Sequence, residues 1–324
     1  ETPTTRTLRL VAADRGALPP FQAGQYINLF VEIDGVHTAR PYAISSSPMQ
    51  RQYYDLTVKR AVGGFVSGYL LDRVHVGQPL LGSGPMGTFH HNPLFHGDEL
   101  VFLAGGSGAA PARSMLLNIL ERGLEQRLHL IYVNSYVDDV IYAEAFRALA
   151  AAHPQFRLTE VISRPPADYR GHSGRLSREL LQAQLGEMGN RMFYVCGPTP
   201  FNDSCLELLS ELGVARRRIR VEANGAPKSP DRQPGWPEGI DLEAEVQITV
   251  RGRGSFRISP CRLSPPVPRR RCLRASPCRW AVCWYPWQPA WPRDPIRKTV
   301  SSPDSLFPTQ IIDPWLSACR QTAR

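Results

Sequence analysis

The chain has 324 residues, of which 42% are hydrophobic, and its formal net charge is +9. This length allows two or three domains with cores of their own, and no apolar run reaches the ~18 residues that a membrane-spanning helix needs. Residues 260–324 hold eleven Lys and Arg against three acidic residues, so the excess charge belongs to this tail and gives no sign of a nucleic-acid partner for the rest of the chain.

Cysteine is sparse before the tail. Of the seven cysteines only Cys196 and Cys205 precede residue 260, and residues 1–8 lack the basic-then-apolar pattern of a signal peptide. This usage is typical of a reducing compartment rather than of a disulfide framework. We therefore expect a cytoplasmic protein without a membrane span.

Residues 1–95 are expected to form an antiparallel β-barrel. Residues 8–11, 26–31 and 54–58 alternate in polarity or carry β-branched side chains, and Gly and Pro separate these segments. Several short strands at such spacing predict a small barrel. One short helix is expected from about Val66 to Asp72.

Residues 96–223 have a different pattern. A strand of the buried type, residues 100–104, is followed by alternating helices and strands. The expected helices are 112–122, 143–152, 177–185 and 201–212, and the expected strands are 128–133, 157–162, 192–195 and 219–222. This alternation predicts an α/β domain with a doubly wound parallel sheet.

The carboxyl-terminal part of the chain loses this regularity. Residues 224–243 are rich in Pro, Gly and charge and indicate a linker, and residues 245–250 and 255–258 indicate a hairpin. Residues 260–324 hold twelve Pro and five of the six Trp, without a helical or strand period. We expect this tail to be irregular and disordered.

A glycine-rich loop follows the strand 100–104. Gly105-Gly106-Ser107-Gly108-Ala109-Ala110-Pro111 leads from that strand into a helix, the context in which glycines and helix N–H groups bind a phosphate. Pro111 is tolerated in the first helical turn, where an N–H has no intrahelical acceptor. An ordinary strand-to-helix turn would explain this segment alone equally well.

The segment Arg40-Pro41-Tyr42-Ala43-Ile44-Ser45-Ser46 suits a flavin. Arg40 and Tyr42 share one face of a strand, so an aromatic ring can stack on the flavin while a cation pairs with phosphate. Without other motifs, an ordinary edge strand would be the better interpretation.

Taken in order, these motifs resemble the ferredoxin–NADP⁺ reductase superfamily over roughly residues 5–222. The resemblance also rests on Gly63-Gly64-Phe65-Val66-Ser67, on residues 84–89 and on Cys196-Gly197-Pro198. It implies that Arg40 contacts the flavin phosphates, that Tyr42 packs on the isoalloxazine and that Cys196 lies against the nicotinamide.

The resemblance supplies a set of candidate site residues. Cys196 and Tyr42 are the candidate catalytic residues, and no metal ligand is expected. The candidate cofactor-binding residues are Arg40, Pro41, Tyr42, Ala43, Ile44, Ser45, Lys59, Gly64, Val66, Ser67, Gly105, Gly106, Ser107, Gly108, Pro111, Arg164, Cys196, Gly197 and Pro198.

Two positions depart from the family pattern. Ala43 stands where relatives carry a Ser or Thr whose hydroxyl bonds flavin N5, and either a backbone N–H or Ser45 could replace that bond. Asn224 stands where many relatives have an aromatic residue that covers the flavin. FAD is favoured over FMN, and NADH and NADPH both remain open. Arg164 is a candidate for pairing with the 2′-phosphate of NADPH, and Tyr169 for stacking on adenine; a solvated loop arginine is an equally good interpretation.

Relatives with this domain order often continue into a plant-type ferredoxin domain, and residues 244–259 resemble its remnant. Its cluster ligands follow C-x₄-C-x₂-C, but after Cys278 and Cys283 the third position is Pro286. We therefore expect no normal 2Fe–2S centre. Our hypothesis is that the sequence after about Ile258 is an out-of-frame translation. Nucleic-acid binding by the tail is a weaker interpretation.

The motifs together predict a flavin-dependent NAD(P)H oxidoreductase. A hydride would pass from the nicotinamide to flavin N5, and the electrons would go to a small acceptor or a protein such as an oxygenase or ferredoxin component. The alternative is a non-catalytic nucleotide-sensing or assembly subunit with the same fold.

Overall fold

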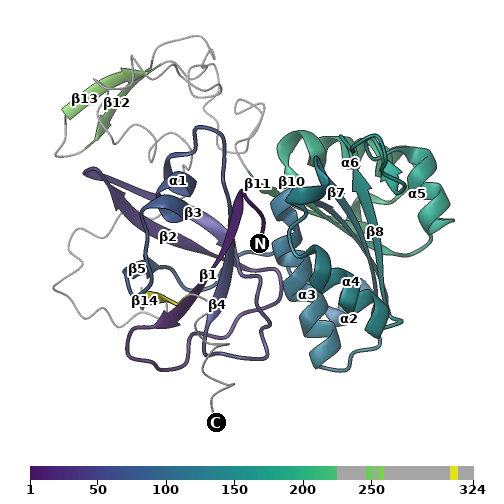
Figure 1. Ribbon diagram of the computed structural model, residues 1–324, viewed down its shortest axis with the longest axis horizontal. Coiled ribbons are helices and arrows are strands. Elements are labelled where there is room, and N and C mark those ends of the chain that lie inside the picture. Colours follow the sequence, from purple (N-terminus) through teal and green to yellow (C-terminus); the bar gives the residue numbers. More distant parts are fainter. Residues whose placement is uncertain (225–245, 251–253, 259–306, 313–324) are drawn as a thin grey trace. The chain divides into compact units, whose positions relative to one another are not determined.

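The computed structural model of the chain describes residues 1–224, 246–250, 254–258 and 307–312 (Figure 1). Within these ranges the strands form two six-stranded sheets and one two-stranded hairpin. The first sheet contains the flavin motif, and the second contains the glycine-rich loop.

The first sheet is antiparallel and barrel-like, as expected. On its second strand every other side chain, from Ile27 to Ile33, is buried, which is the strand period that the sequence indicated. A bridge between Ile44 and Leu56 joins the segment after the third strand to the fourth. The strands are β1 (Thr5–Ala12), β2 (Tyr26–Ile33), β3 (Val36–Ala43), β4 (Tyr54–Lys59), β5 (Pro79–Gly82) and β14 (Phe307–Ile312), in the order β3-β2-β5-β14-β1-β4.

Strand β14 belongs to the tail, where the sequence pattern did not indicate a strand. It pairs antiparallel with both β1 and β5. A local pattern carries little information about such a pairing, because strand formation depends on distant partners. Residues 259–306 and 313–324, which hold the other tail predictions, lie outside the described residues.

The second sheet is parallel and doubly wound, as expected. Its strand order is β11-β10-β6-β7-β8-β9. The strands are β6 (Glu99–Gly105), β7 (Arg127–Asn134), β8 (Phe156–Ile162), β9 (His172–Ser173), β10 (Met192–Pro198) and β11 (Ile219–Asn224). The helices are α3 (Ala109–Glu121), α4 (Ala143–Ala152), α5 (Arg178–Leu185) and α6 (Thr199–Glu211), with one-turn 3₁₀ segments η1 (Gly106–Gly108), η2 (Val137–Asp139) and η3 (Arg216–Arg218).

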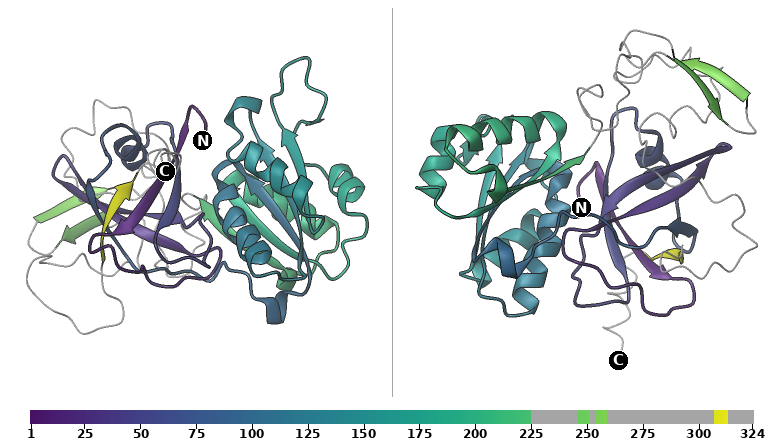
Figure 2. Two further views of the ribbon diagram at one scale, coloured as in Figure 1. Left: turned by 60° about the horizontal axis from the view of Figure 1, so that its bottom comes forward. Right: turned by 180° about the vertical axis from the view of Figure 1, so that it is seen from behind.

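Helices cover both faces of this sheet (Figure 2). On one face Met115 of α3 and Phe146 of α4 pack with Phe102 of β6 in one buried cluster. On the other face Leu181 of α5 and Leu209 of α6 belong to a second cluster. Because all strands run in the same direction, their carboxyl ends meet at one edge, where the glycine-rich loop lies.

Three shorter elements complete the described chain. The helix α1 (Phe65–Asp72) begins one residue before its expected start, and α2 (Pro93–His96) was not expected. The predicted hairpin is present as β12 (Val246–Val250) and β13 (Gly254–Ile258), paired antiparallel. The predicted linker, apart from Asn224, lies outside the described residues.

Candidate functional site

The glycine-rich loop is built to leave backbone N–H groups available. β6 ends at Gly105, η1 follows, and α3 begins at Ala109. No side chain caps the start of η1 or α3, and the first N–H groups of a helix have no intrahelical acceptor. Gly106 has a φ of 53°, which favours glycine. This geometry fits the pyrophosphate of a dinucleotide.

Gly108 brings the loop against the end of β10. A Cβ atom at this position would overlap the carbonyl group of Cys196. Next to it, a Cβ atom on Gly197 would overlap Phe201 and lie 3.2 Å from the Cα of Gly105. The backbones of the two nucleotide motifs are therefore in close contact, and the glycines make that contact possible.

Cys196 is buried at the carboxyl end of β10, with a relative exposure of 1%. Its strand neighbours are Ala104 of β6 and Glu222 of β11. The side-chain amide of Asn202 donates to the Glu222 carbonyl at 2.9 Å and so fixes β11 to α6. A small, weakly polar side chain suits a surface against which a flat ring lies.

Glu222 is a site residue that the sequence analysis missed. Burial raises the pKa of its carboxyl group to about 7. The signal in the sequence was weak, since β11 also carries the polar residues Arg220 and Asn224. Glu222 is the register partner of Cys196 in the sheet, so a carboxyl group with a raised pKa is added to the candidate residues at this edge.

Arg40 and Tyr42 lie on β3, two residues apart and on the same face of the strand. Burial raises the pKa of the Tyr42 phenol, although the nearby Arg40 charge opposes this, so the phenol remains neutral. One guanidinium nitrogen of Arg40 donates to the Ala39 carbonyl at 2.7 Å. An aromatic ring and a cation are thus held together, as flavin binding requires.

The end of the flavin motif points into the barrel. Ile44 and Ser45 are fully buried. The Ser45 hydroxyl donates to the Asp55 carbonyl at 3.0 Å and lies 3.1 Å from the Thr57 hydroxyl. Ser45 is therefore committed to the barrel interior and is not positioned to replace the hydroxyl that Ala43 lacks.

The start of α1 resembles the nucleotide loop in its open N-terminus. Gly64 is the N-cap residue, and no side chain accepts from the first turn. The Ser67 hydroxyl instead accepts from the Ala61 N–H at 3.1 Å, and Val66 is buried. The free N–H groups here are compatible with a second phosphate.

Hydrogen bonds tie the flavin motif to the helix that follows the glycine-rich loop. Arg113 of α3 donates to the Ser45 carbonyl at 2.7 Å, and the Ser114 hydroxyl donates to the Ser46 carbonyl at 2.8 Å. The hydroxyl groups of Thr57 and Tyr142 are in direct contact. The flavin motif is therefore bonded directly to the helix that the glycine-rich loop opens, about sixty residues later in the sequence.

Lys59 lies at the end of β4 beside the glycine-rich loop. Its ammonium group would be 3.7 Å from a Cβ atom on Gly106, and it forms a 2.6 Å ion pair with Asp139. Asp139 also accepts from the hydroxyls of Thr2 and Thr4. Burial would raise the pKa of Asp139, but these hydrogen bonds outweigh it and hold the pKa below its usual value.

Arg164 follows β8 at the same edge of the sheet. Its N–H donates to the Ser135 carbonyl at 2.9 Å, and its guanidinium donates to the Tyr136 hydroxyl at 3.0 Å. The side chain is exposed. The structure thus pairs Arg164 with Tyr136.

Comparison with known proteins agrees with both halves of this site. Residues 3–91 match the family of the oxidoreductase FAD-binding domain, and residues 102–206 match that of the oxidoreductase NAD-binding domain. A ferredoxin–NADP reductase B from Sorangium cellulosum is 34% identical over 68% of this chain and 91% of its own length. The chain belongs to the ferredoxin–NADP reductase superfamily.

Other members of this superfamily are reductase components of oxygenases. The glycine betaine monooxygenase reductase subunit of Pseudomonas aeruginosa is 31% identical over 76% of this chain and 70% of its own length. The phenol 2-monooxygenase reductase component of a Pseudomonas strain is 32% identical over 65% of this chain, but the match spans 61% of the relative.

Solved structures share the fold. The FAD/NAD-binding domain of a nitric oxide dioxygenase from Vibrio cholerae superposes with a TM-score of 0.62 at 26% identity, over 69% of this chain and 94% of that one. Phthalate dioxygenase reductase gives 0.59 at 18% identity, over 79% of this chain and 72% of that one. Among the described residues, none of the helices is long and apolar enough to cross a membrane.

Proposed function

We propose that this chain is an FAD-dependent NAD(P)H oxidoreductase that serves as the reductase of an electron-transfer chain. The observation that carries this proposal is the direct hydrogen bonding of the flavin motif to α3, from Arg113 to Ser45 and from Ser114 to Ser46. This bonding supports a shared site for the flavin motif and the glycine-rich loop, because both motifs are attached to α3. When bound, a flavin accepts a hydride from a nicotinamide and can release the electrons singly.

The chain's own residues bind and orient the two cofactors. Arg40 and the open N-terminus of α1 would hold the flavin phosphates, and the N–H groups of Gly106 to Gly108 would hold the nucleotide pyrophosphate. Lys59 adds a positive charge between the barrel and the loop. Its ion pair with Asp139 fixes the position of that charge before the nucleotide arrives.

Cys196 and Tyr42 would orient the reacting rings. Tyr42 supplies a neutral aromatic face for the flavin, and Cys196 supplies a small buried surface for the nicotinamide. The Ala43 side chain has no hydroxyl for flavin N5, and the Ser45 hydroxyl is used inside the barrel. A backbone N–H is therefore the remaining candidate donor near that atom.

We further propose that the electrons pass to an oxygenase or ferredoxin-type protein. Support comes from the relatives, which include reductase components of phenol and glycine betaine monooxygenases and a ferredoxin–NADP reductase. Arg164 supports the use of NADPH, because its guanidinium is held at the carboxyl edge of the sheet by Tyr136.

The proposal is tested by anaerobic reduction of the purified full chain loaded with FAD. We expect NADPH or NADH to bleach the flavin band near ~450 nm. An oxidised spectrum that persists with both nucleotides, in protein that retains FAD, would favour the non-catalytic subunit instead. Arg164→Ala should weaken NADPH binding and leave NADH binding unchanged. Equal effects on the affinity for both nucleotides would argue against a contact of Arg164 with the 2′-phosphate.

A further inference from the structure

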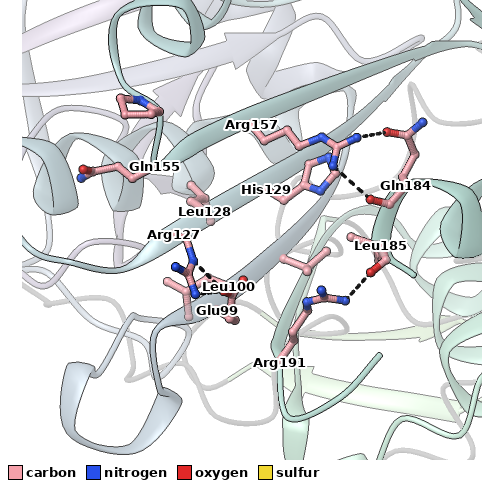
Figure 3. A pocket seen from close by; sticks show the side chains of 12 residues that line it. Glu99, Leu100, Arg127, Leu128, His129, Gln155, Arg157, Gln184, Leu185 and Arg191 are labelled. Atoms are coloured by element: carbon pink, nitrogen blue, oxygen red, sulfur yellow. Dashed lines mark hydrogen bonds and ion pairs between the residues drawn. The ribbon is translucent and has the colours of Figure 1, made fainter. Parts of the chain in front are cut away.

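A cavity of about 240 Å³ lies at the amino ends of β6, β7, β8 and β10 (Figure 3). The glycine-rich loop lies at the carboxyl ends of the same strands. Since β6 spans Glu99–Gly105 and a strand rises ~3.3 Å per residue, the two ends are about 20 Å apart. The cavity is therefore separate from the proposed cofactor site.

The sheet face that lines this cavity changes from apolar to basic along its strands. Val161 and Ile131 pack in the cluster beneath α5. One strand period further toward the amino ends, the same face carries His129 and Thr159, and then Arg127 and Arg157. The core of this face therefore ends in a row of cationic and polar groups.

Two of the arginines that line the cavity have no carboxylate partner among the described residues. Arg127 pairs with Glu99, with Nε 2.6 Å from Oε1. Arg157 donates to the backbone and side-chain oxygens of Gln184, and Arg191 donates to the Leu185 carbonyl at 2.7 Å (Figure 3). These contacts cap the carboxyl end of α5 and leave the exposed Arg157 and the half-buried Arg191 without a carboxylate partner in the described part of the chain.

Each guanidinium retains donors beyond these contacts. A guanidinium has about five N–H donors. Arg157 uses its two terminal nitrogens toward Gln184, and Arg191 uses Nη1 alone, toward Leu185 and Glu187. The caps therefore fix where the two cations sit without exhausting their capacity to bind an anion.

The protonation state of His129 follows from its hydrogen bonds. Thr159 donates its hydroxyl proton to the Gln184 amide oxygen at 3.0 Å, because that oxygen can only accept. Thr159 must then accept from Nε2 of His129, which lies 2.9 Å away. The neutral ring consequently has its proton on Nε2 and a free acceptor at Nδ1.

The charges of the cavity act on this ring. Burial, and then the charges of Arg157 and Arg191, lower the pKa of His129 to about 4. The ring is therefore neutral at neutral pH, and Arg127, Arg157, Arg191 and Glu99 leave the cavity lining with a net positive charge. An anion between the two unpaired arginines would cancel part of this effect, so its binding would raise the pKa of His129.

We propose that this cavity binds a small oxyanion, a phosphate or a carboxylate, between Arg157 and Arg191. Its volume equals that of about eight liquid waters at ~30 Å³ each, so it suits a small acid rather than a macromolecule. The site is independent of the proposed oxidoreductase function. It would hold α5 to the sheet more firmly when it is occupied.

The test follows the imidazole of His129 by NMR in the full-length protein. The chain has eight histidines, and the resonance that disappears in His129→Gln identifies the right one. Inorganic phosphate and malonate are titrated separately, each against chloride at equal ionic strength. We expect a saturable shift of the His129 resonance and a raised His129 pKa with phosphate, with malonate or with both. The anion that binds with the higher affinity shows whether the site prefers a phosphate or a carboxylate.

Variants connect this shift to the arginines. Arg157→Gln should weaken binding of the anion at least about tenfold, the usual effect of losing a charge-assisted hydrogen bond. Arg217→Gln removes the same charge from an exposed position on η3 and should change nothing. Chloride reproducing the shift, both anions leaving His129 unaffected, or Arg157→Gln behaving as Arg217→Gln would each overturn the proposal. The comparison of anions in the unmodified chain decides the matter even if a variant fails to fold.

Discussion

Replacing Gly108 by Ala should separate the two nucleotide motifs. The new Cβ atom would overlap the carbonyl of Cys196, and both partners are backbone in well-packed elements, so neither can move without shifting α3 or β10. Overpacking of this kind costs about 1–3 kcal/mol of the free energy of unfolding. The displaced loop should also lose its N–H contacts to the nucleotide.

The matched control is Gly68→Ala. Gly68 lies within α1, and no atom outside the local helix backbone stands within 4 Å of the position that the new methyl group would take. This change should stabilise the protein by about 0.5–1 kcal/mol, because Ala favours the helix.

Urea unfolding followed by circular dichroism measures the stability of both variants, and fluorescence of NADPH measures binding. We expect Gly108→Ala to be less stable and to bind NADPH at least about tenfold more weakly, if about 1.4 kcal/mol of contact is lost. Equal stability and equal NADPH affinity in the two variants would refute the close packing of the loop against Cys196.

Four further substitutions test the site. Asp139→Asn removes an acceptor whose folded pKa lies below its unfolded value, so it should destabilise the protein by about 1–2 kcal/mol at pH 7, and the difference from wild type in urea should shrink as the pH falls below about 4. Glu222 has a folded pKa of about 7, above its unfolded value, so its stabilising contribution is lost as the pH rises from about 4 to 7. Glu222→Gln should therefore be more stable than wild type at pH 8 by about 1–3 kcal/mol. The same dependence of unfolding free energy on pH in both proteins would contradict the burial of Glu222. Arg40→Ala should lower FAD occupancy on purification, and full occupancy would argue against its phosphate contact. Cys196→Ser should slow stopped-flow flavin reduction more than it weakens FAD binding, and an unchanged rate would reject its place at the nicotinamide.

The sequence was most informative where structure is local. The hydrophobic periodicity of Ile27 to Ile33 predicted the barrel, and that of the helices packed on the second sheet predicted the α/β domain. Gly105 to Pro111 identified the loop between a strand and a helix. These features depend on residues close in the chain, so a single sequence contains them.

The sequence was less informative where distant residues meet. The Ser45 hydroxyl was one of two candidate donors for flavin N5, and only the approach of Asp55 and Thr57 shows that it faces the barrel interior. The partner of Lys59 is Asp139, eighty residues away, and the position of β14 depends on two strands near the other end of the chain. Pairings of this kind are decided by tertiary packing, which local propensity does not encode.

The gathering of donors around Asp139 has a consequence for handling the protein. Two of its partners, Thr2 and Thr4, lie in a short segment ahead of β1. Cleavage between Thr4 and Thr5 would leave this carboxylate with Lys59 as its remaining side-chain donor among the described residues. Preparations that differ only in such cleavage should therefore differ in melting temperature. The intact mass of each preparation should be measured together with its activity.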